Sequence, residues 1–178
     1  MTTEILIAGF GGQGILFAGK FLANMGMMEG RYLSWLPSYG PEMRGGTANC
    51  SVVLSDDEPI GSPIVNKPDI LAAMNLPSLD KYEDTVVPGG TIFVDSTLIT
   101  RKVKRTDVKT FYIPATRLAQ ENGLNGLANM ILVGKMMKEC KILPYEDIEN
   151  AVRAVVSAKH ADLFDVNMKA IGLGYTFE

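Results

Sequence analysis

The sequence predicts an α/β domain of three layers, α/β/α, built on a mostly parallel but mixed β-sheet. Two observations lead to this fold class. Short apolar, β-branched segments alternate with helical segments along most of the chain, and helical periodicity dominates its last third. Alternating strands and helices pack best as a sheet with helices on both faces. Because no repeat or long polar linker divides residues 1–178, a single domain is expected.

Each expected strand is a short apolar or alternating run bounded by turn residues. The first run, residues 4–9, is apolar without alternation, which suits a strand that is buried on both faces. The expected strands are residues 4–9, 32–36, 47–54, 69–75, 91–95 and 110–114.

The expected helices are residues 13–28, 77–84, 116–122 with Thr116 as cap, 125–140 opened by Asn125, and an amphipathic helix that starts at Pro144. The polar side chains of residues 13–28 form only a narrow stripe along the expected helix, so this helix should be buried against more than one neighbour. Ten Met and a mean hydropathy of +0.12 indicate either a Met-padded core or a face that a partner covers. The apolar character of the first expected helix favours a face that a partner covers.

A glycine-rich turn follows the first expected strand. Gly9, Gly11 and Gly14 match the pattern G-x-G-x-x-G, and Gly12 and Gln13 complete the segment. With a buried strand before it and a helix after it, this turn is typical of a Rossmann-like domain. Glycines there let backbone N–H groups approach a phosphate at the positive end of the helix. A phosphate contact is therefore favoured over a turn that only lets strand and helix pack closely.

Two nucleotide-binding signatures that use such a turn are incomplete here. A dinucleotide site also needs a carboxylate at the end of the second strand to hold the ribose hydroxyls, and residues 36–39 contain none. A P-loop needs Ser or Thr after its Gly-Lys pair, where this chain has Phe21 after Lys20. An NTPase is excluded, whereas a free-standing nucleotide- or NAD-binding enzyme remains the alternative.

Composition removes further function classes. Cys50 and Cys140 are too few for an iron–sulfur cluster or a zinc finger, so no metal site is expected. A net charge of −3 without a basic stripe argues against nucleic-acid binding. The longest apolar run is far too short for a membrane span and the first residues do not form a signal peptide, so a cytoplasmic protein is expected.

Residues 37–46 form a second punctuated segment, too rich in Gly and Pro for a helix or a central strand. We interpret it as a structured loop carrying Tyr39, Glu42 and Arg44. The guanidinium of Arg44 offers a planar fork for a phosphate or carboxylate. A surface salt bridge between Glu42 and Arg44 is the alternative, but loops of this kind usually carry function.

Together, residues 9–14 and 38–46 closely resemble the gamma subunit, or gamma domain, of the 2-oxoacid:ferredoxin oxidoreductases. Asn129 and Met130 within residues 127–134 resemble that family's helix motif as well. The resemblance covers nearly the whole chain, whose length suits a free-standing gamma subunit.

The resemblance implies a role in a larger oxidoreductase that decarboxylates a 2-oxoacid, such as 2-oxoglutarate or pyruvate, to an acyl-CoA and reduces ferredoxin. Alpha and beta subunits would hold thiamine diphosphate with Mg²⁺, and cysteine-rich parts, including a ferredoxin-like delta subunit, would hold [4Fe-4S] clusters. This chain would help to bind or cover coenzyme A and to assemble the complex. A purely architectural subunit that touches no ligand is a further alternative.

The resemblance also implies which residues contact coenzyme A or lie at the interface between subunits. Gln13 and Asn129 are the weaker candidates, since Asn129 could instead satisfy a backbone group. No nucleophile, base and orienting group occur together, so no catalytic residue is assigned. The candidates are Gly9, Gly11, Gly12, Gln13, Gly14, Tyr39, Glu42, Arg44 and Asn129.

Three other features have ordinary explanations. The basic run 101–105 could steer an anionic partner, but a solvated edge is favoured. Asp95 ends a strand, where it could meet a ligand or only cap a turn. His160 has no Cys or Ser within motif range and is expected on the surface or in the core.

Overall fold

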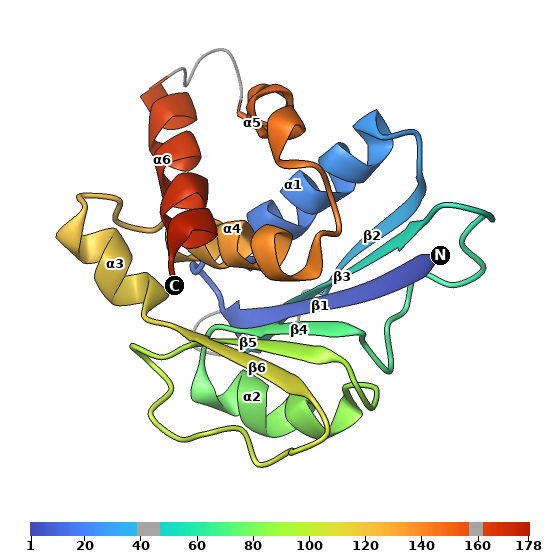
Figure 1. Ribbon diagram of the computed structural model, residues 1–178, viewed down its shortest axis with the longest axis horizontal. Coiled ribbons are helices and arrows are strands. Elements are labelled where there is room, and N and C mark those ends of the chain that lie inside the picture. The colour runs from blue at the N-terminus through green and yellow to red at the C-terminus, as the bar shows by residue number, and fades with distance from the viewer. Residues whose placement is uncertain (39–46, 157–161) are drawn as a thin grey trace.

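The computed structural model describes residues 1–38, 47–156 and 162–178. Figure 1 shows one β-sheet with helices on both faces. The strands are β1 (Thr2–Phe10), β2 (Tyr32–Ser38), β3 (Thr47–Ser55), β4 (Ile70–Ala73), β5 (Thr91–Asp95) and β6 (Lys109–Ile113). The helices are α1 (Ile15–Met28), α2 (Leu76–Tyr82), α3 (Ala115–Glu121), α4 (Ala128–Cys140), α5 (Ile148–Val155) and α6 (Asp162–Thr176), with 3₁₀ turns at Glu83–Thr85 and Tyr145–Asp147.

The sheet is mixed, as the sequence predicts. Its strand order is β2-β3-β1-β4-β5-β6. The neighbours from β1 to β6 run parallel, whereas β3 runs antiparallel to both β1 and β2. Among the described strands, β3 therefore runs opposite to its neighbours and makes the sheet mixed.

Side chains of the central strands alternate between two hydrophobic cores. Ile5 and Ile7 face the core formed with α1, α4, α5 and α6, where Phe21 is fully buried. Leu6 faces the second core, which includes Leu79 of α2. Burying each large apolar side chain contributes about 1.5–3 kcal/mol. The apolar run in β1 thus produces the predicted three layers, because both of its faces need a cover.

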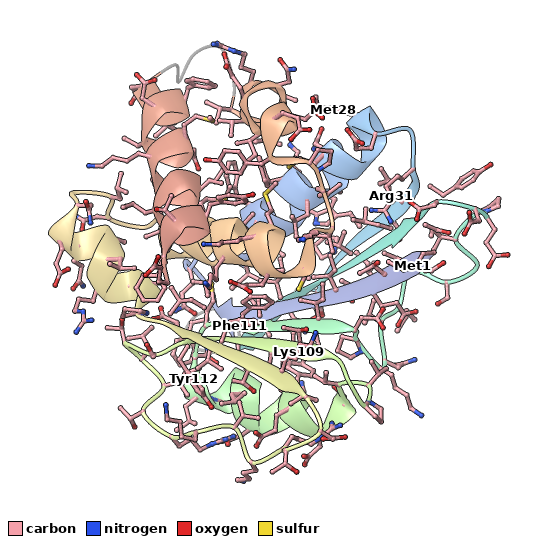
Figure 2. The ribbon with its side chains drawn as sticks, in the orientation of Figure 1. Met1, Met28, Arg31, Lys109, Phe111 and Tyr112 are labelled. Atoms are coloured by element: carbon pink, nitrogen blue, oxygen red, sulfur yellow. The ribbon has the colours of Figure 1, made fainter. Side chains whose placement is uncertain are left out.

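Helix α1 is buried against several neighbours, as its narrow polar stripe predicts. Some methionines lie in the core and others lie on the surface. Met25 is fully buried in the core, whereas Met27 is 59% and Met28 40% exposed at the end of α1, where Figure 2 labels Met28. The core therefore uses some methionines, and others remain on the surface.

Several boundaries differ from the sequence predictions. The helix expected from Pro144 begins with a 3₁₀ turn at Tyr145–Asp147 and becomes α5 only at Ile148, and α6 was not among the expected helices. Pro37 and Ser38 belong to β2, which tolerates a proline because it is an edge strand paired only with β3. Thr116 does not cap α3 but lies inside its first turn. Asn125 does not open α4, which begins at Ala128 after a turn in which Gly126 has φ +83°.

Helices α4 and α6 cross in close contact through two glycines. A Cβ on Gly134 would overlap the carbonyl group of Ile171, and one on Gly174 would overlap that of Ile131. Any other residue would push the helices apart. In the described part of the chain, no helix combines the length and apolarity needed to cross a bilayer.

Candidate functional site

The carboxyl ends of the parallel strands form the edge at which ligands usually bind in such sheets. After β1 the chain continues into α1 on one face, and after β4 it continues into α2 on the other. This divergence between neighbouring strands opens a crevice at their carboxyl ends. α3 lies at the same edge, since it follows β6 directly (Figure 1).

The glycine loop lies at the carboxyl end of β1, before α1, and its glycines have different roles. Gly9 is required for packing, because a Cβ there would lie 2.7 Å from Ile15 Cδ1 and 3.1 Å from Met74 Cβ. Gly14 is the N-cap of α1 and has φ +73°. Gly11 and Gly12 are exposed, and Gly12 has φ +94° with no described atom within 4 Å of the position of a Cβ. The backbone at Gly12 is therefore accessible to a ligand.

Two side-chain amides hold this loop in place. Gln13 accepts a hydrogen bond from the Phe10 N–H (2.6 Å) and donates one to the Met74 carbonyl (3.0 Å), which ties the loop to the end of β4. Asn129, at the start of α4, donates to the Gly14 carbonyl (2.9 Å) and is 2% exposed. Asn129 thus satisfies a backbone group, and its Oδ1 has no partner among the described residues.

The first turn of α1 presents an open positive end. Gly14 provides no side-chain cap, and the turn contains no acidic residue. The N–H groups and the dipole of this 14-residue helix therefore favour an anion next to Gly12 and Gly14.

A pocket of ≈ 300 Å³ adjoins the glycine loop. No sequence motif marks it, because its walls combine helix α3 and the start of α4 with the connections after β1, β4, β5 and α3. Its lining residues are Gln13, Met74, Leu98, Thr116, Ala119, Gln120, Asn125, Gly126 and Ala128.

The second motif cannot be placed in the same detail, because Tyr39, Glu42 and Arg44 lie outside the described residues. The backbone on both sides of them is described. Ser38 ends β2, and Thr47 begins β3 paired with Phe10, the last residue of β1. The glycine loop therefore follows the carboxyl end of β1, and the second motif follows the carboxyl end of β2. These two ends lie at the same edge of the sheet.

Within the basic run, Lys102 and Lys104 are exposed, whereas the two arginines form hydrogen bonds. Arg101 donates hydrogen bonds to Asp80 and to Glu83, which is 1% exposed. These carboxylates raise the pKa of Arg101, with the hydrogen bond to Glu83 as the largest cause. Arg105 pairs with Asp107 and donates to the Val86 carbonyl. Both arginines therefore fasten the loop before β6 to the segment after α2.

Asp95 has a structural role, as one of its two interpretations predicts. Its carboxylate is fully buried and accepts hydrogen bonds from the N–H of Thr97 and from the N–H and hydroxyl of Thr116. It fixes α3 to the end of β5. His160 lies outside the described residues.

The two thiols are poor nucleophiles. Burial raises the pKa of Cys50 to about 12 and that of Cys140 to about 11, so both stay protonated near neutral pH. Across the described ranges, no group of three or more His, Cys, Asp or Glu residues is placed to hold a metal.

Known proteins resemble this chain along nearly its full length. A family model described as pyruvate ferredoxin/flavodoxin oxidoreductase matches residues 4–177. The chain is 41% identical over 172 residues to the ketoisovalerate oxidoreductase subunit VorA of Methanothermobacter thermautotrophicus, covering 96% of this chain but only 35% of VorA. It is 37% identical over 178 residues to the 2-oxoglutarate synthase subunit KorC of Methanocaldococcus jannaschii, covering 98% of this chain and 93% of KorC.

Solved structures agree with this relationship. The keto/oxoacid ferredoxin oxidoreductase gamma subunit from Geobacter sulfurreducens has a TM-score of 0.82 and 29% identity, with 97% of this chain and 96% of that chain covered. A 2-oxoglutarate:ferredoxin oxidoreductase from Magnetococcus marinus with 2-oxoglutarate, coenzyme A and succinyl-CoA bound shares the fold, with a TM-score of 0.85 and 21% identity over 97% of this chain and 30% of that chain. A free-standing NAD enzyme is not favoured by these relatives. The chain belongs to the pyruvate ferredoxin/flavodoxin oxidoreductase family and corresponds to its gamma subunit.

Proposed function

We propose that this chain, folded as one domain over residues 1–178, works within a cytoplasmic 2-oxoacid:ferredoxin oxidoreductase and contributes to coenzyme A binding and to assembly. The overall reaction converts a 2-oxoacid, coenzyme A and two oxidised ferredoxins into an acyl-CoA, CO₂, two reduced ferredoxins and a proton. The names of KorC and VorA support 2-oxoglutarate or a branched 2-oxoacid as substrate.

One observation carries the coenzyme A assignment: the glycine loop, the open end of α1 and the ≈ 300 Å³ pocket lie together at the carboxyl edge. The accessible backbone at Gly12 suits a phosphate of the coenzyme, and Arg44 is proposed as a second anion contact. The support of the loop is assigned to Gly9, Gln13 and Asn129. Contacts at the interface with the partner subunits are assigned to Gly11, Tyr39 and Glu42. The coenzyme supplies the thiol that takes up the acyl group.

The remaining chemistry is assigned to partner subunits. Thiamine diphosphate with Mg²⁺ would lie in the alpha and beta subunits, and [4Fe-4S] clusters in cysteine-rich parts such as a delta subunit, because this chain has only two cysteines. Ferredoxin would accept the electrons from those clusters. Substrate choice would then depend on the thiamine-bearing subunits.

Anaerobic purification of the chain with its natural partners tests this function. The preparation should contain iron and thiamine and should reduce ferredoxin only when both a 2-oxoacid and coenzyme A are present. A chain that purifies alone without cofactors would contradict the proposal. Arg44→Ala should raise the KM for coenzyme A in the intact complex; unchanged assembly and KM would remove Arg44 from the site.

A further inference from the structure

We propose that the outer edge of β2 binds a second copy of this chain, strand against strand, so that two sheets join across a twofold axis. β2 lies at the border of the sheet (Figure 1), and no described strand pairs with its outer side. An open edge presents backbone N–H and C=O groups that can pair with another chain, and monomeric proteins commonly protect it with charged side chains. The segment Tyr32–Ser38 contains no Asp, Glu, Lys or Arg.

Large apolar side chains gather along this edge instead. In β2, Tyr32, Trp35 and Leu36 are 36–47% exposed. Met27 and Met28 are exposed at the end of α1, which packs on β2 and β3. Side chains of this size, exposed to this extent on two copies, bring an interface to the roughly 1,000 Å² that a specific contact needs.

Met27 lies on the side of α1 that faces the open edge. Gly26 packs on Leu54 of β3, so this position of the helix faces the sheet. Met25 and Met27 flank Gly26 on opposite sides of the helix. Because Met25 is fully buried in the core, Met27 points away from the core and towards the outer side of β2.

Pro37 indicates which backbone groups of β2 are available. A proline has no N–H and fits in a paired strand only where its nitrogen faces away from the partner strand. Pro37 is opposite Cys50 of β3, so its nitrogen faces outward. Backbone groups alternate in direction along an antiparallel strand, so Leu33 and Trp35 also direct their N–H and C=O groups outward.

These groups select one register, in which β2 pairs antiparallel with its copy around Ser34. Leu33 of one copy then exchanges two hydrogen bonds with Trp35 of the other, and the twofold axis repeats this pair. Tyr32 lies opposite Leu36, which brings the exposed apolar side chains of the two copies together. The strand is complementary to itself in this arrangement, and this favours a second copy over an unrelated partner.

Disulfide formation in the purified full chain and in the assembled complex tests this register. The two Ser34 side chains would form a non-hydrogen-bonded pair, with Cβ atoms about 4.5–5.5 Å apart. Ser34→Cys should therefore link two copies under mild oxidation, giving a product of twice the chain mass on a non-reducing gel. Ser38→Cys is the matched control, because Ser38 is exposed on the same face of β2 but does not meet itself in this register. Cys50 and Cys140 should not compete, since burial raises the pKa of both thiols.

Charge substitutions at the same position test the contact without oxidation. The wild-type chain should be a dimer by light scattering. Ser34→Lys places two like charges opposite each other and should raise the dissociation constant of the dimer about fivefold. An equimolar mixture of Ser34→Lys and Ser34→Asp chains should restore the dimer, because opposite charges then meet.

Three results would overturn the inference. The first is a monomeric wild-type chain, and the second is equal linking of Ser34→Cys and Ser38→Cys. The third is a Ser34→Cys chain that does not link to its copy in the assembled complex, where a different subunit would then cover β2. None of these measurements depends on coenzyme A, so they are independent of the proposed function.

Discussion

Glycines serve opposite purposes at the glycine loop and at the crossing of α4 and α6. At the crossing, Gly134 and Gly174 lie in ordinary helix, and a Cβ on either would overlap the backbone of the other helix. In the loop, Gly12 and Gly14 have positive φ, and Gly12 faces open space. The crossing therefore requires glycine for its small size, whereas Gly12 in the loop requires it for its conformation. Only the loop leaves backbone accessible to a ligand.

The largest effect is expected at the helix crossing. Gly174→Ala should lower the free energy of unfolding by about 3 kcal/mol, because the new methyl group has no space beside Ile131. Gly172→Ala is the matched control on the same helix, since its Cβ would lie 3.8 Å from the Tyr145 hydroxyl. Gly172→Ala should stabilise the chain by about 0.5–1 kcal/mol. Equal denaturation midpoints for the two variants would show that the crossing does not require glycine.

Gly14→Ala should cost about 2 kcal/mol, for two reasons. The left-handed conformation is unfavourable for alanine, and the methyl group would meet the Asn129 amide. In an Asn129→Ala background only the conformational cost, about 1 kcal/mol, should remain. A double-mutant cycle by chemical denaturation measures the difference, and additive effects would argue against the contact.

Gly12→Ala should cost about 1 kcal/mol of stability, since only its φ is unfavourable. In the assembled complex the same change should raise the KM for coenzyme A, because it hinders the approach of a phosphate to the backbone. Gly30→Ala is the control: Gly30 has φ +70° and open space, but it follows α1 at its far end. If both variants shift the KM equally, the loop has no special role in binding.

The smallest effect concerns a third close approach, where Gly19 of α1 packs on Cys50 and Trp35. Burial raises the pKa of Cys50 to about 12, whereas an unfolded thiol titrates near 8.5. Well below pH 8.5 the Cys50 thiol is protonated in both the folded and the unfolded chain, and its full contribution to stability is present. Above pH 8.5 the thiol ionises in the unfolded chain while it stays protonated in the folded chain. Through Cys50 alone, the free energy of unfolding should fall by about 0.7 kcal/mol from pH 8 to pH 9. Cys140, whose pKa is raised to about 11, should add a similar fall.

Thermal unfolding of wild type and Cys50→Ala over this pH range measures the effect. The slope should be smaller in the variant, which lacks the thiol. Rapid reaction of Cys50 with a thiol reagent in the folded chain at pH 8 would contradict its burial.

Local sequence patterns were sufficient for most of the fold. The β-branched runs and the glycine turn predicted β1 and α1 with small boundary errors, because period and turn chemistry act over a few residues. The predictions for Thr116 and Asn125 were wrong because each residue's local capping preference was overridden. Thr116 bonds to the distant Asp95, and Asn125 lies in a turn at the pocket.

The sequence by itself therefore determined the α/β class, the family and the glycine loop, because each can be recognised from short motifs or local periodicity. Only the tertiary structure decided the rest. Gln13 and Asn129 became supports of the loop through contacts to Met74 and Gly14. The pocket exists because connecting segments meet at one edge of the sheet, and contacts between segments this distant leave no periodic signal in a single sequence.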